Sequence, residues 1–311
     1  MLATFTSFSR VALIANPRAG AFRGKRAAEA AAEVFADAGH AVEVQLTERA
    51  GHAGELANEA ATRFDLILAV GGDGTLAEVL IGLASHAAAP VTGIIPVGTA
   101  NVVAREIGLP LKSPKRAAEA LATGKVVLID QGLANGRPFV ANVGAGFDAR
   151  VVHALTAARA RKRGRTGMLG YLPIGLGELK RFEAPRLFVV TEDGERLGAF
   201  SAVTVCNTAN YGGIMSLTPK ATMTDGRLDL YARRGTGRRS TFRQLACGLL
   251  RCEDSQKVTY RSGTRFRIEC EGAAEPLQID GDPAGLLPAE ISLIPKGLRF
   301  LVPSRFSVRE P

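Results

Sequence analysis

Residues 64–75 read FDLILAVGGDGT, an apolar run that leads directly into a glycine-rich turn. The run Phe64–Val70 predicts a buried strand, because strands covered on both faces are nearly continuous in apolar residues. A helical segment, residues 76–86, follows the turn Gly71–Thr75. Glycines at this position let backbone N–H groups approach phosphate oxygens, and the helix N-terminus adds a positive dipole. The stretch therefore predicts a ligand site at the carboxyl edge of a parallel sheet.

The same alternation of strand and helix extends on both sides of this stretch. Strands are predicted at 10–15, 41–46, 64–70, 91–97 and 126–129, and helices at 21–38, 51–62, 76–86, from 102 to about 107, and 114–123. Such alternation is typical of a parallel sheet with helices on both faces. We therefore expect an α/β domain over residues 1–130.

The remainder of the chain has a different sequence pattern. Short strands separated by Gly, Asp and Pro are predicted at 137–143, 186–191, 199–206, 227–232, 256–260, 264–270, 276–280 and 290–294. This spacing predicts an antiparallel β-sandwich or barrel over residues 131–295, with a helical insertion at 149–182. The tail, residues 296–311, contains one more strand, which is a candidate to return to the first domain.

Composition excludes several classes of protein. The 311 residues are 46% apolar and 22% charged, which excludes a disordered chain, a fibre and a polytopic membrane protein. No run reaches the roughly 18 apolar residues of a membrane span, and the first ten residues lack signal-peptide features. Four cysteines include no CxxC pair, so neither a disulfide scaffold nor a structural zinc site is expected. We expect a cytoplasmic protein.

The net charge of +9 is unevenly distributed. Residues 1–147 hold 13 basic and 13 acidic side chains, whereas residues 148–311 hold 26 basic and 17 acidic ones. Arginine and lysine crowd residues 159–165 and 233–243. A basic half predicts contact with an anionic membrane surface, although a role in solubility alone stays open. Nucleic acid is not an expected partner, because aromatic residues make up only 6% and tryptophan is absent.

Two further loops resemble the first in their position. Asn16-Pro17-Arg18-Ala19-Gly20 follows the strand at 10–15, and Gly98-Thr99-Ala100-Asn101 follows the strand at 91–97. Because the carboxyl ends of parallel strands meet at one edge, the three loops should converge there and form a nucleotide site. Asp73 would add a carboxylate that helps to hold Mg²⁺ or positions a hydroxyl.

Together these motifs resemble the diacylglycerol kinase catalytic family, which includes bacterial soluble lipid kinases and is related to sphingosine and ceramide kinases. Glycine-rich GGDG loops also occur in NAD kinases and phosphofructokinases. Downstream, the segments that match are 144–149 (GAGFDA), 210–215 (NYGGIM), 224–229 (TDGRLD) and 279–283 (IDGDP). The resemblance implies an α/β nucleotide-binding domain like that of NAD kinase and phosphofructokinase, joined to a β-sandwich lipid-substrate domain, with catalysis in the cleft between them.

The resemblance also implies roles for individual residues. Positions matched to ATP contacts are Asn16, Arg18, Thr47, Gly71, Gly72, Asp73, Gly74, Thr75, Glu78, Gly98, Thr99 and Asn101. Asp225 would bind Mg²⁺ through its side chain and Thr222 and Arg227 through their carbonyls, while Asp130 would help to organise metal and water. Asp280 or Asp282 would accept the proton of the acceptor hydroxyl, with Asp73 as a further catalytic residue.

Three positions depart from the family pattern. Leu76-Ala77 stands where relatives often have Asn, Val102 replaces an Asp, and Asp282 replaces a Glu. The absence of the acid at 102 puts one acidic link of the relatives' Mg²⁺ network in doubt.

The predicted function is therefore phosphoryl transfer from ATP, with Mg²⁺, to a primary hydroxyl of a membrane lipid of the diacylglycerol or ceramide/sphingoid type. The alternatives are a soluble-substrate kinase resembling NAD kinase, and a non-catalytic relative that binds lipid or nucleic acid. Expected partners are the lipid substrate and the inner face of an anionic membrane, where the protein would bind peripherally, with a homodimer as a further candidate.

Overall fold

The computed structural model describes residues 8–162, 174, 177–179, 182–213, 215–235 and 257–308. The chain divides into two compact units. One comprises Met1–Gln131 with Pro295–Pro311, and the other Gly132–Ile294. Strands β5 (Lys125–Ala134) and β16 (Ala289–Val302) each run across this division.

The first unit is built on a parallel sheet with the order β2–β1–β3–β4. Its strands are β1 (Arg10–Ala15), β2 (Ala41–Leu46), β3 (Leu66–Gly71) and β4 (Val91–Pro96). Every residue of β3 and β4 is buried, as their apolar composition predicts. The end of β16 joins the sheet beside β4, with Phe300 opposite Thr92, and this is the place of the strand expected in the tail.

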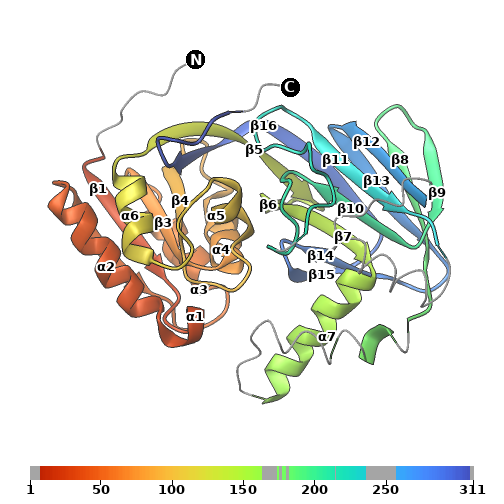
Figure 1. Cartoon of the computed structure of the whole chain (residues 1–311), viewed down its shortest axis with the longest axis horizontal. Coiled ribbons are helices and arrows are strands. Elements are labelled where there is room, and N and C mark those ends of the chain that lie inside the picture. Colours follow the sequence, from red (N-terminus) through yellow and green to blue (C-terminus); the bar gives the residue numbers. More distant parts are fainter. Residues whose placement is uncertain are drawn as a thin grey trace. The chain divides into compact units, whose positions relative to one another are not determined.

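Helices pack in two pairs around this sheet (Figure 1). The helices are α1 (Ala19–Phe22), α2 (Gly24–Asp37), α3 (His52–Ala60), α4 (Asp73–Leu83), α5 (Val102–Glu106) and α6 (Pro114–Ala122). One pair is α2 with α6, and the other is α3 with α4. Small side chains such as Ala27, Ala31 and Ala57 face the core, which lets the helices lie close to the strands.

The second unit is an antiparallel sandwich, so the predicted fold class is confirmed for both units. One sheet has six strands in the order β12–β11–β10–β7–β14–β15, namely β12 (Val258–Gly263), β11 (Leu228–Arg233), β10 (Ala202–Cys206), β7 (Asn142–Gly146), β14 (Pro276–Ile279) and β15 (Asp282–Leu286). The opposing layer contains β13 (Arg265–Glu271), β8 (Arg186–Thr191), β9 (Arg196–Phe200) and the first part of β16. Apolar residues of both layers, including Val143, Val203, Val189 and Phe266, form one core cluster.

Several predicted boundaries were wrong. The strand predicted at 137–143 is two strands, β6 (Arg137–Phe139) and β7, and the one at 199–206 is divided between β9 and β10. Residues 290–294 and the tail strand form one continuous strand, β16, which adopts a positive φ of 53° at Lys296. β15 was not predicted, because Pro283 and Gly285 are atypical of strands.

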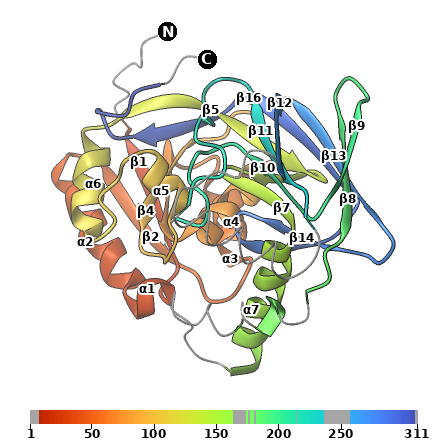
Figure 2. The same cartoon turned by 45° about the vertical axis from the view of Figure 1, so that its right-hand side comes forward.

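One long helix lies against the six-stranded sheet. α7 (Phe147–Lys162) packs beside β14, as Figure 2 shows. It accounts for the start of the helical insertion predicted at 149–182, and most of the remainder of that insertion lies outside the described residues.

Candidate active site

Three strand-to-helix loops meet at the carboxyl edge of the parallel sheet. The Asn16 N–H donates to the Val70 carbonyl at 3.1 Å, which joins the first loop to the end of β3. The N–H groups of Val97 and Gly98 donate to the Gly71 carbonyl at 2.7 and 3.2 Å, which joins the third loop to the second. Backbone hydrogen bonds therefore fix the three loops to one another.

Two glycines let the second and third loops approach closely. A Cβ atom added at Gly98 would lie 2.5 Å from the Cα of Gly72 and 2.8 Å from Oδ1 of Asn101. Asn101 adopts a left-handed conformation with φ of 48°, and its Nδ2 donates to the Gly98 carbonyl at 2.9 Å. Its buried Oδ1 has no hydrogen-bond partner within the described part of the chain. Any side chain at 98 would separate the two loops.

Asp73 connects the first turns of two helices. It is the first residue of α4, and its Oδ1 accepts from the N–H of Val103 in α5 at 3.3 Å. Burial raises the pKa of this carboxyl, and hydrogen bonds from the backbone N–H groups of Val102 and Val103 partly offset the increase. Asp73 thus holds the GGDGT loop and the GTAN loop together.

A polar pocket of about 190 Å³ opens beside these loops. Its lining residues are Asn16, Arg18, Thr47, Glu48, Arg49, Ala50, Ala53, Thr75 and Glu78. Five of these were predicted to contact ATP, namely Asn16, Arg18, Thr47, Thr75 and Glu78. The other predicted contacts lie in the GGDGT and GTAN loops and do not line this pocket in the part of the chain that the structure describes: Gly71, Gly72, Asp73, Gly74, Gly98, Thr99 and Asn101.

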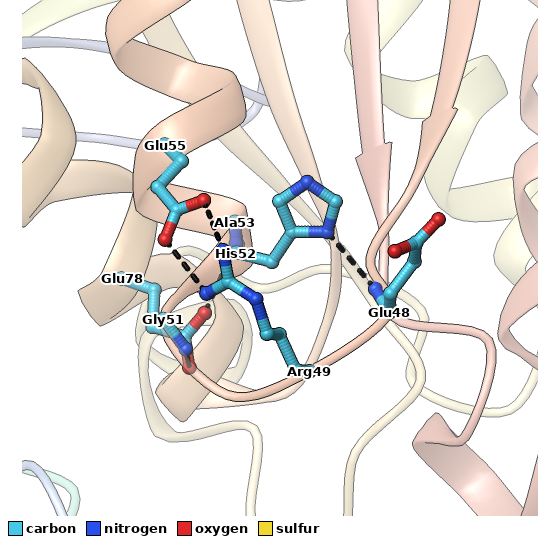
Figure 3. Close-up of polar contacts among 7 residues, drawn as sticks. All are labelled: Glu48, Arg49, Gly51, His52, Ala53, Glu55 and Glu78. Carbon is cyan, nitrogen blue, oxygen red and sulfur yellow. Dashed lines mark hydrogen bonds and ion pairs between the residues drawn. The ribbon is translucent and has the colours of Figure 1, made fainter.

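One wall of the pocket is the loop of residues 47–53, which Figure 3 shows in detail. The Glu78 carboxylate accepts from the N–H groups of Gly51 and Ala53 at 2.9 and 3.2 Å. These are among the first N–H groups of α3, so Glu78 caps that helix from a neighbouring one. Glu78 therefore shapes the pocket wall as well as lining it.

Charged side chains of the same loop complete this wall (Figure 3). Arg49 makes two hydrogen bonds to Glu55, at 2.7 and 2.6 Å, and these hydrogen bonds lower the pKa of the exposed Glu55. The Glu48 N–H donates to Nδ1 of His52 at 3.1 Å. Glu48 and Arg49 were not predicted as site residues. The signal that could have found them is their place directly after a strand of the parallel sheet.

The second unit carries the acidic turn between β14 and β15. Asp280 has a positive φ of 50°, and its carboxylate accepts from the N–H groups of Val140, Ala141 and Asn142 at 3.0, 2.9 and 2.8 Å. Its own N–H donates to the Asn142 carbonyl at 2.9 Å. The three donors bind the carboxylate oxygens of Asp280 and so anchor the turn.

Asp282 lies two residues further along and is much more accessible. Its side chain is 46% exposed, and Oδ2 lies 3.9 Å from Nη2 of Arg137. Of the two acids predicted as the proton acceptor, the geometry therefore favours Asp282.

The predicted metal residues of the second unit lie in the loop before β11. Oδ1 of Asp225 accepts from the Arg227 N–H at 3.0 Å, and Thr222 is almost fully buried. Burial and the nearby charge of Asp225 raise the pKa of Asp229, so two carboxyl groups share this region. Carboxylate, carbonyl and hydroxyl oxygens fit a hard cation such as Mg²⁺. No cluster of three or more His, Cys, Asp or Glu side chains with metal-binding spacing occurs among the described residues.

Asp130, the remaining predicted metal residue, has a different environment. It is fully buried in β5 of the first unit, and its Oδ1 accepts from the Lys296 N–H at 2.8 Å. This bond supports the positive φ of Lys296 and ties β5 to β16 within the unit.

The predicted membrane-facing arginines are only partly described. In the second basic run, Arg233 is 2% exposed and so cannot contact a membrane, contrary to the prediction, whereas the next residue, Arg234, is exposed. The side chains of residues 159–165, 238, 239 and 243 lie outside the described part. Arginines on β8, β9 and β13 are exposed but form ion pairs with glutamates. Among the described residues, no helix is long and apolar enough to cross a membrane.

A parallel-sheet unit with glycine-rich loops beside a polar pocket, together with a sandwich unit that carries an acidic turn, defines the class of two-unit kinases. The model of the diacylglycerol kinase catalytic domain matches residues 10–134, and that of the YegS C-terminal NAD kinase beta sandwich-like domain matches residues 141–302. The chain therefore belongs to the diacylglycerol kinase family and is a lipid kinase.

Individual relatives match over most of their length. A diacylglycerol kinase of Bacillus subtilis (strain 168) is 31% identical over 298 residues, which cover 94% of this chain and 96% of the relative. A diacylglycerol kinase of Mycobacterium tuberculosis (strain H37Rv) is 35% identical over 258 residues, 80% of each chain. The crystal structure of a diacylglycerol kinase from Bacillus anthracis (strain Sterne) shares the fold, with a TM-score of 0.75 and 24% identity over 97% of this chain and all of that one.

Proposed function

We propose that this lipid kinase transfers the γ-phosphoryl group of ATP to a primary hydroxyl of a membrane lipid, with Mg²⁺ bound. Diacylglycerol is the first acceptor to test, because the relatives carry that name. Ceramide and sphingoid bases share the required primary hydroxyl and are the alternatives. The observation that carries the proposal is the meeting of three glycine-containing strand-to-helix loops beside one polar pocket.

The first unit would bind the nucleotide. Backbone N–H groups of the GGDGT loop and the start of α4 offer donors to phosphate oxygens, and the guanidinium of Arg18 adds positive charge at the pocket. Thr47 and Thr75 supply hydroxyl groups from the lining. Glu78 and Asp73 would act by holding the loops in place, since their carboxylates accept from backbone N–H groups.

The second unit would supply the base. In the proposed reaction the lipid hydroxyl gives its proton to the Asp282 carboxylate while its oxygen forms a bond to the γ-phosphorus. The bond from the γ-phosphorus to the bridging oxygen breaks at the same time, so that ADP leaves. Asp225, with the carbonyl oxygens of Thr222 and Arg227, would hold Mg²⁺, which would neutralise phosphate charge when bound. Asp280 takes no proton, because its carboxylate anchors the turn.

The lipid acceptor requires the protein to work at a membrane surface. The excess of basic residues after position 147 favours peripheral binding to anionic lipid at the inner membrane face. Sedimentation with vesicles tests this directly. Binding to phosphatidylglycerol vesicles that weakens as salt rises supports the proposal, and equal binding to neutral vesicles contradicts it.

An acceptor panel tests the activity. The purified protein would be incubated with γ-labelled ATP, Mg²⁺ and mixed micelles of diacylglycerol, ceramide, sphingosine or monoacylglycerol, with NAD as a soluble acceptor. Label in one lipid, lost on chelation of Mg²⁺ and in Asp225→Asn, is the expected result. Label in NAD but in none of the lipids would favour the soluble-substrate alternative and overturn the proposal.

A further inference from the structure

A chain of polar side chains lies inside the second unit, directly beneath the acidic turn. The Tyr211 hydroxyl donates to Oδ2 of Asp148 at 2.6 Å. Nε2 of Gln278 donates to Asn142 Oδ1 at 2.8 Å and approaches Asp148 Oδ2 at 3.3 Å. Oε1 of Gln278 accepts from the Gly281 N–H at 2.8 Å. The chain thus ends on the residue between Asp280 and Asp282.

The surroundings of this chain leave Gln278 one orientation. Gln278 is 2% exposed and Asn142 is 5% exposed, so neither side chain can exchange its partners for water. Both groups near Nε2 are acceptors, which requires the amide nitrogen to face them and its oxygen to face Gly281. Burial raises the pKa of Asp148, while the Tyr211 and Gln278 donors oppose that increase.

Packing on the neighbouring strand is adapted to the same chain. A Cβ atom at Gly144 of β7 would collide with Oδ2 of Asp148 and lie 2.7 Å from Nε2 of Gln278. Glycine at this position therefore leaves the space that the hydrogen bonds occupy. This gives a physical reason for the glycine in the GAGFDA segment.

The turn is held on two sides. Asp280 and Gly281 both have positive φ, 50° and 82°, as the two-residue hairpin turn between β14 and β15 requires. The Asp280 carboxylate holds one side of the turn through three N–H groups, and Gln278 holds the other side through the N–H of Gly281. The position of the following residue, Asp282, depends on both attachments.

We propose that Tyr211, Asp148 and Gln278 form a positioning chain that sets the location of the Asp282 carboxylate for proton transfer. The proposal rests on the function proposed above, in which Asp282 is the base. Its three members contact neither acceptor nor nucleotide in this account. Their effect is transmitted through the backbone of the turn.

Two variants and a matched control test the chain. Gln278→Leu removes the acceptor of the Gly281 N–H, and Tyr211→Phe removes the hydroxyl that donates to Asp148 and is also hydrogen-bonded to Thr204. His153→Gln is the control, because His153 Nε2 lies 2.8 Å from the Leu277 carbonyl, in the same interface between α7 and β14, but does not touch the chain. Each protein would be compared in kcat, in KM for ATP, in thermal stability and in hydrogen exchange of the peptide that contains Gly281.

The expected result separates positioning from simple loss of stability. Gln278→Leu should lower kcat by about 10²-fold, the cost of misplacing a catalytic group by about 1 Å, with KM for ATP within about twofold. Exchange at Gly281 should be faster by about tenfold or more, since its N–H loses its partner. Tyr211→Phe should lower kcat by about three- to tenfold, and the control should match the wild type in kcat and in exchange at Gly281.

Two results would overturn the proposal. One is hydrogen exchange at Gly281 that is unchanged in both Gln278→Leu and Tyr211→Phe. The other is faster hydrogen exchange at Gly281 in a variant that keeps the wild-type kcat. A wild-type protein that phosphorylates no lipid would instead contradict the proposed function. That failure is recognisable because the control is equally inactive, and the proposal of a positioning chain for Asp282 would fall with it.

Discussion

Gly98→Ala is the substitution whose effect can be worked out most fully from the structure. The new Cβ would lie 2.5 Å from the Cα of Gly72, whereas carbon atoms in ordinary contact are about 3.5 Å apart or more. The GGDGT and GTAN loops must therefore separate by about 1 Å. Both neighbours on that side, Gly72 Cα and Gly72 N, are backbone atoms, so no side-chain rotation can relieve the collision.

The expected effect has two parts. Overpacking costs about 1–3 kcal/mol of stability, and misplacement of phosphate-binding N–H groups by about 1 Å costs about 10²-fold in kcat/KM for ATP. Gly124→Ala is the matched control, because its Cβ would collide with the Val302 carbonyl in the same unit, away from the loops. It should lose similar stability but keep wild-type ATP kinetics.

Initial-rate kinetics with γ-labelled ATP, together with thermal denaturation, measure both parts. Two results would contradict this expectation: wild-type kcat/KM for ATP in Gly98→Ala, and an equal loss of kcat/KM in Gly124→Ala. In the first case the two loops would not need their close approach to bind nucleotide. In the second case the loss would reflect stability alone.

Three further outcomes follow from single contacts. Glu78→Gln should lower the unfolding free energy by about 1 kcal/mol, since the uncharged cap of α3 is weaker, and urea unfolding checks this. Arg150→Met should destabilise the fold by about 3 kcal/mol in urea unfolding, because Glu275 is 2% exposed and loses its partner, whereas adding Glu275→Gln should restore most of the loss. Burial raises the pKa of Asp148, so the protonated Asp148 carboxyl contributes fully to folding stability below the ordinary carboxyl pKa. This contribution to stability is lost as pH rises through the raised pKa. The unfolding free energy of Asp148→Asn minus that of the wild type should therefore increase as pH rises above about 4, and a flat difference would contradict this sign.

The fold class could be predicted because the apolar runs report burial directly. FDLILAV is apolar throughout and becomes a fully buried parallel strand, while shorter runs separated by Gly and Pro become the antiparallel sandwich. The chain divides into its two units after Gln131. The continuity of β16 was harder to predict, because the strand passes through Pro295-Lys296-Gly297 without a break. The Asp130 carboxylate binds the Lys296 N–H at this point.

The site could be predicted where it depends on local loop chemistry. Asn16, Arg18 and Thr75 lie in motifs with recognisable glycine and turn residues, and the structure places them in one pocket lining. Arg49 and Glu48 have no such motif, and their loop takes part of its shape from the hydrogen bonds that Gly51 and Ala53 donate to the distant Glu78.

Tertiary pairing accounts for what sequence patterns missed in the second unit. The polar chain beneath the acidic turn joins positions 148, 211 and 278, which no local pattern connects. Arg233 belongs to a basic run that is typical of a surface, but it is buried, because it is the last residue of strand β11 in the sandwich. Only the strand pairing reveals which arginines are exposed.

The most direct test of the account is the turnover of Asp282→Asn with the lipid that the acceptor panel identifies. Loss of a general base predicts a fall in kcat of about 10²–10⁴-fold, with KM for ATP within about threefold because the residues proposed to bind the nucleotide are untouched. Asp280→Asn differs from Asp282→Asn because it weakens the hydrogen bonds that anchor the turn, and it should lower thermal stability as well as kcat. A kcat for Asp282→Asn equal to that of the wild type would contradict the account, since proton transfer would then not pass through this carboxylate.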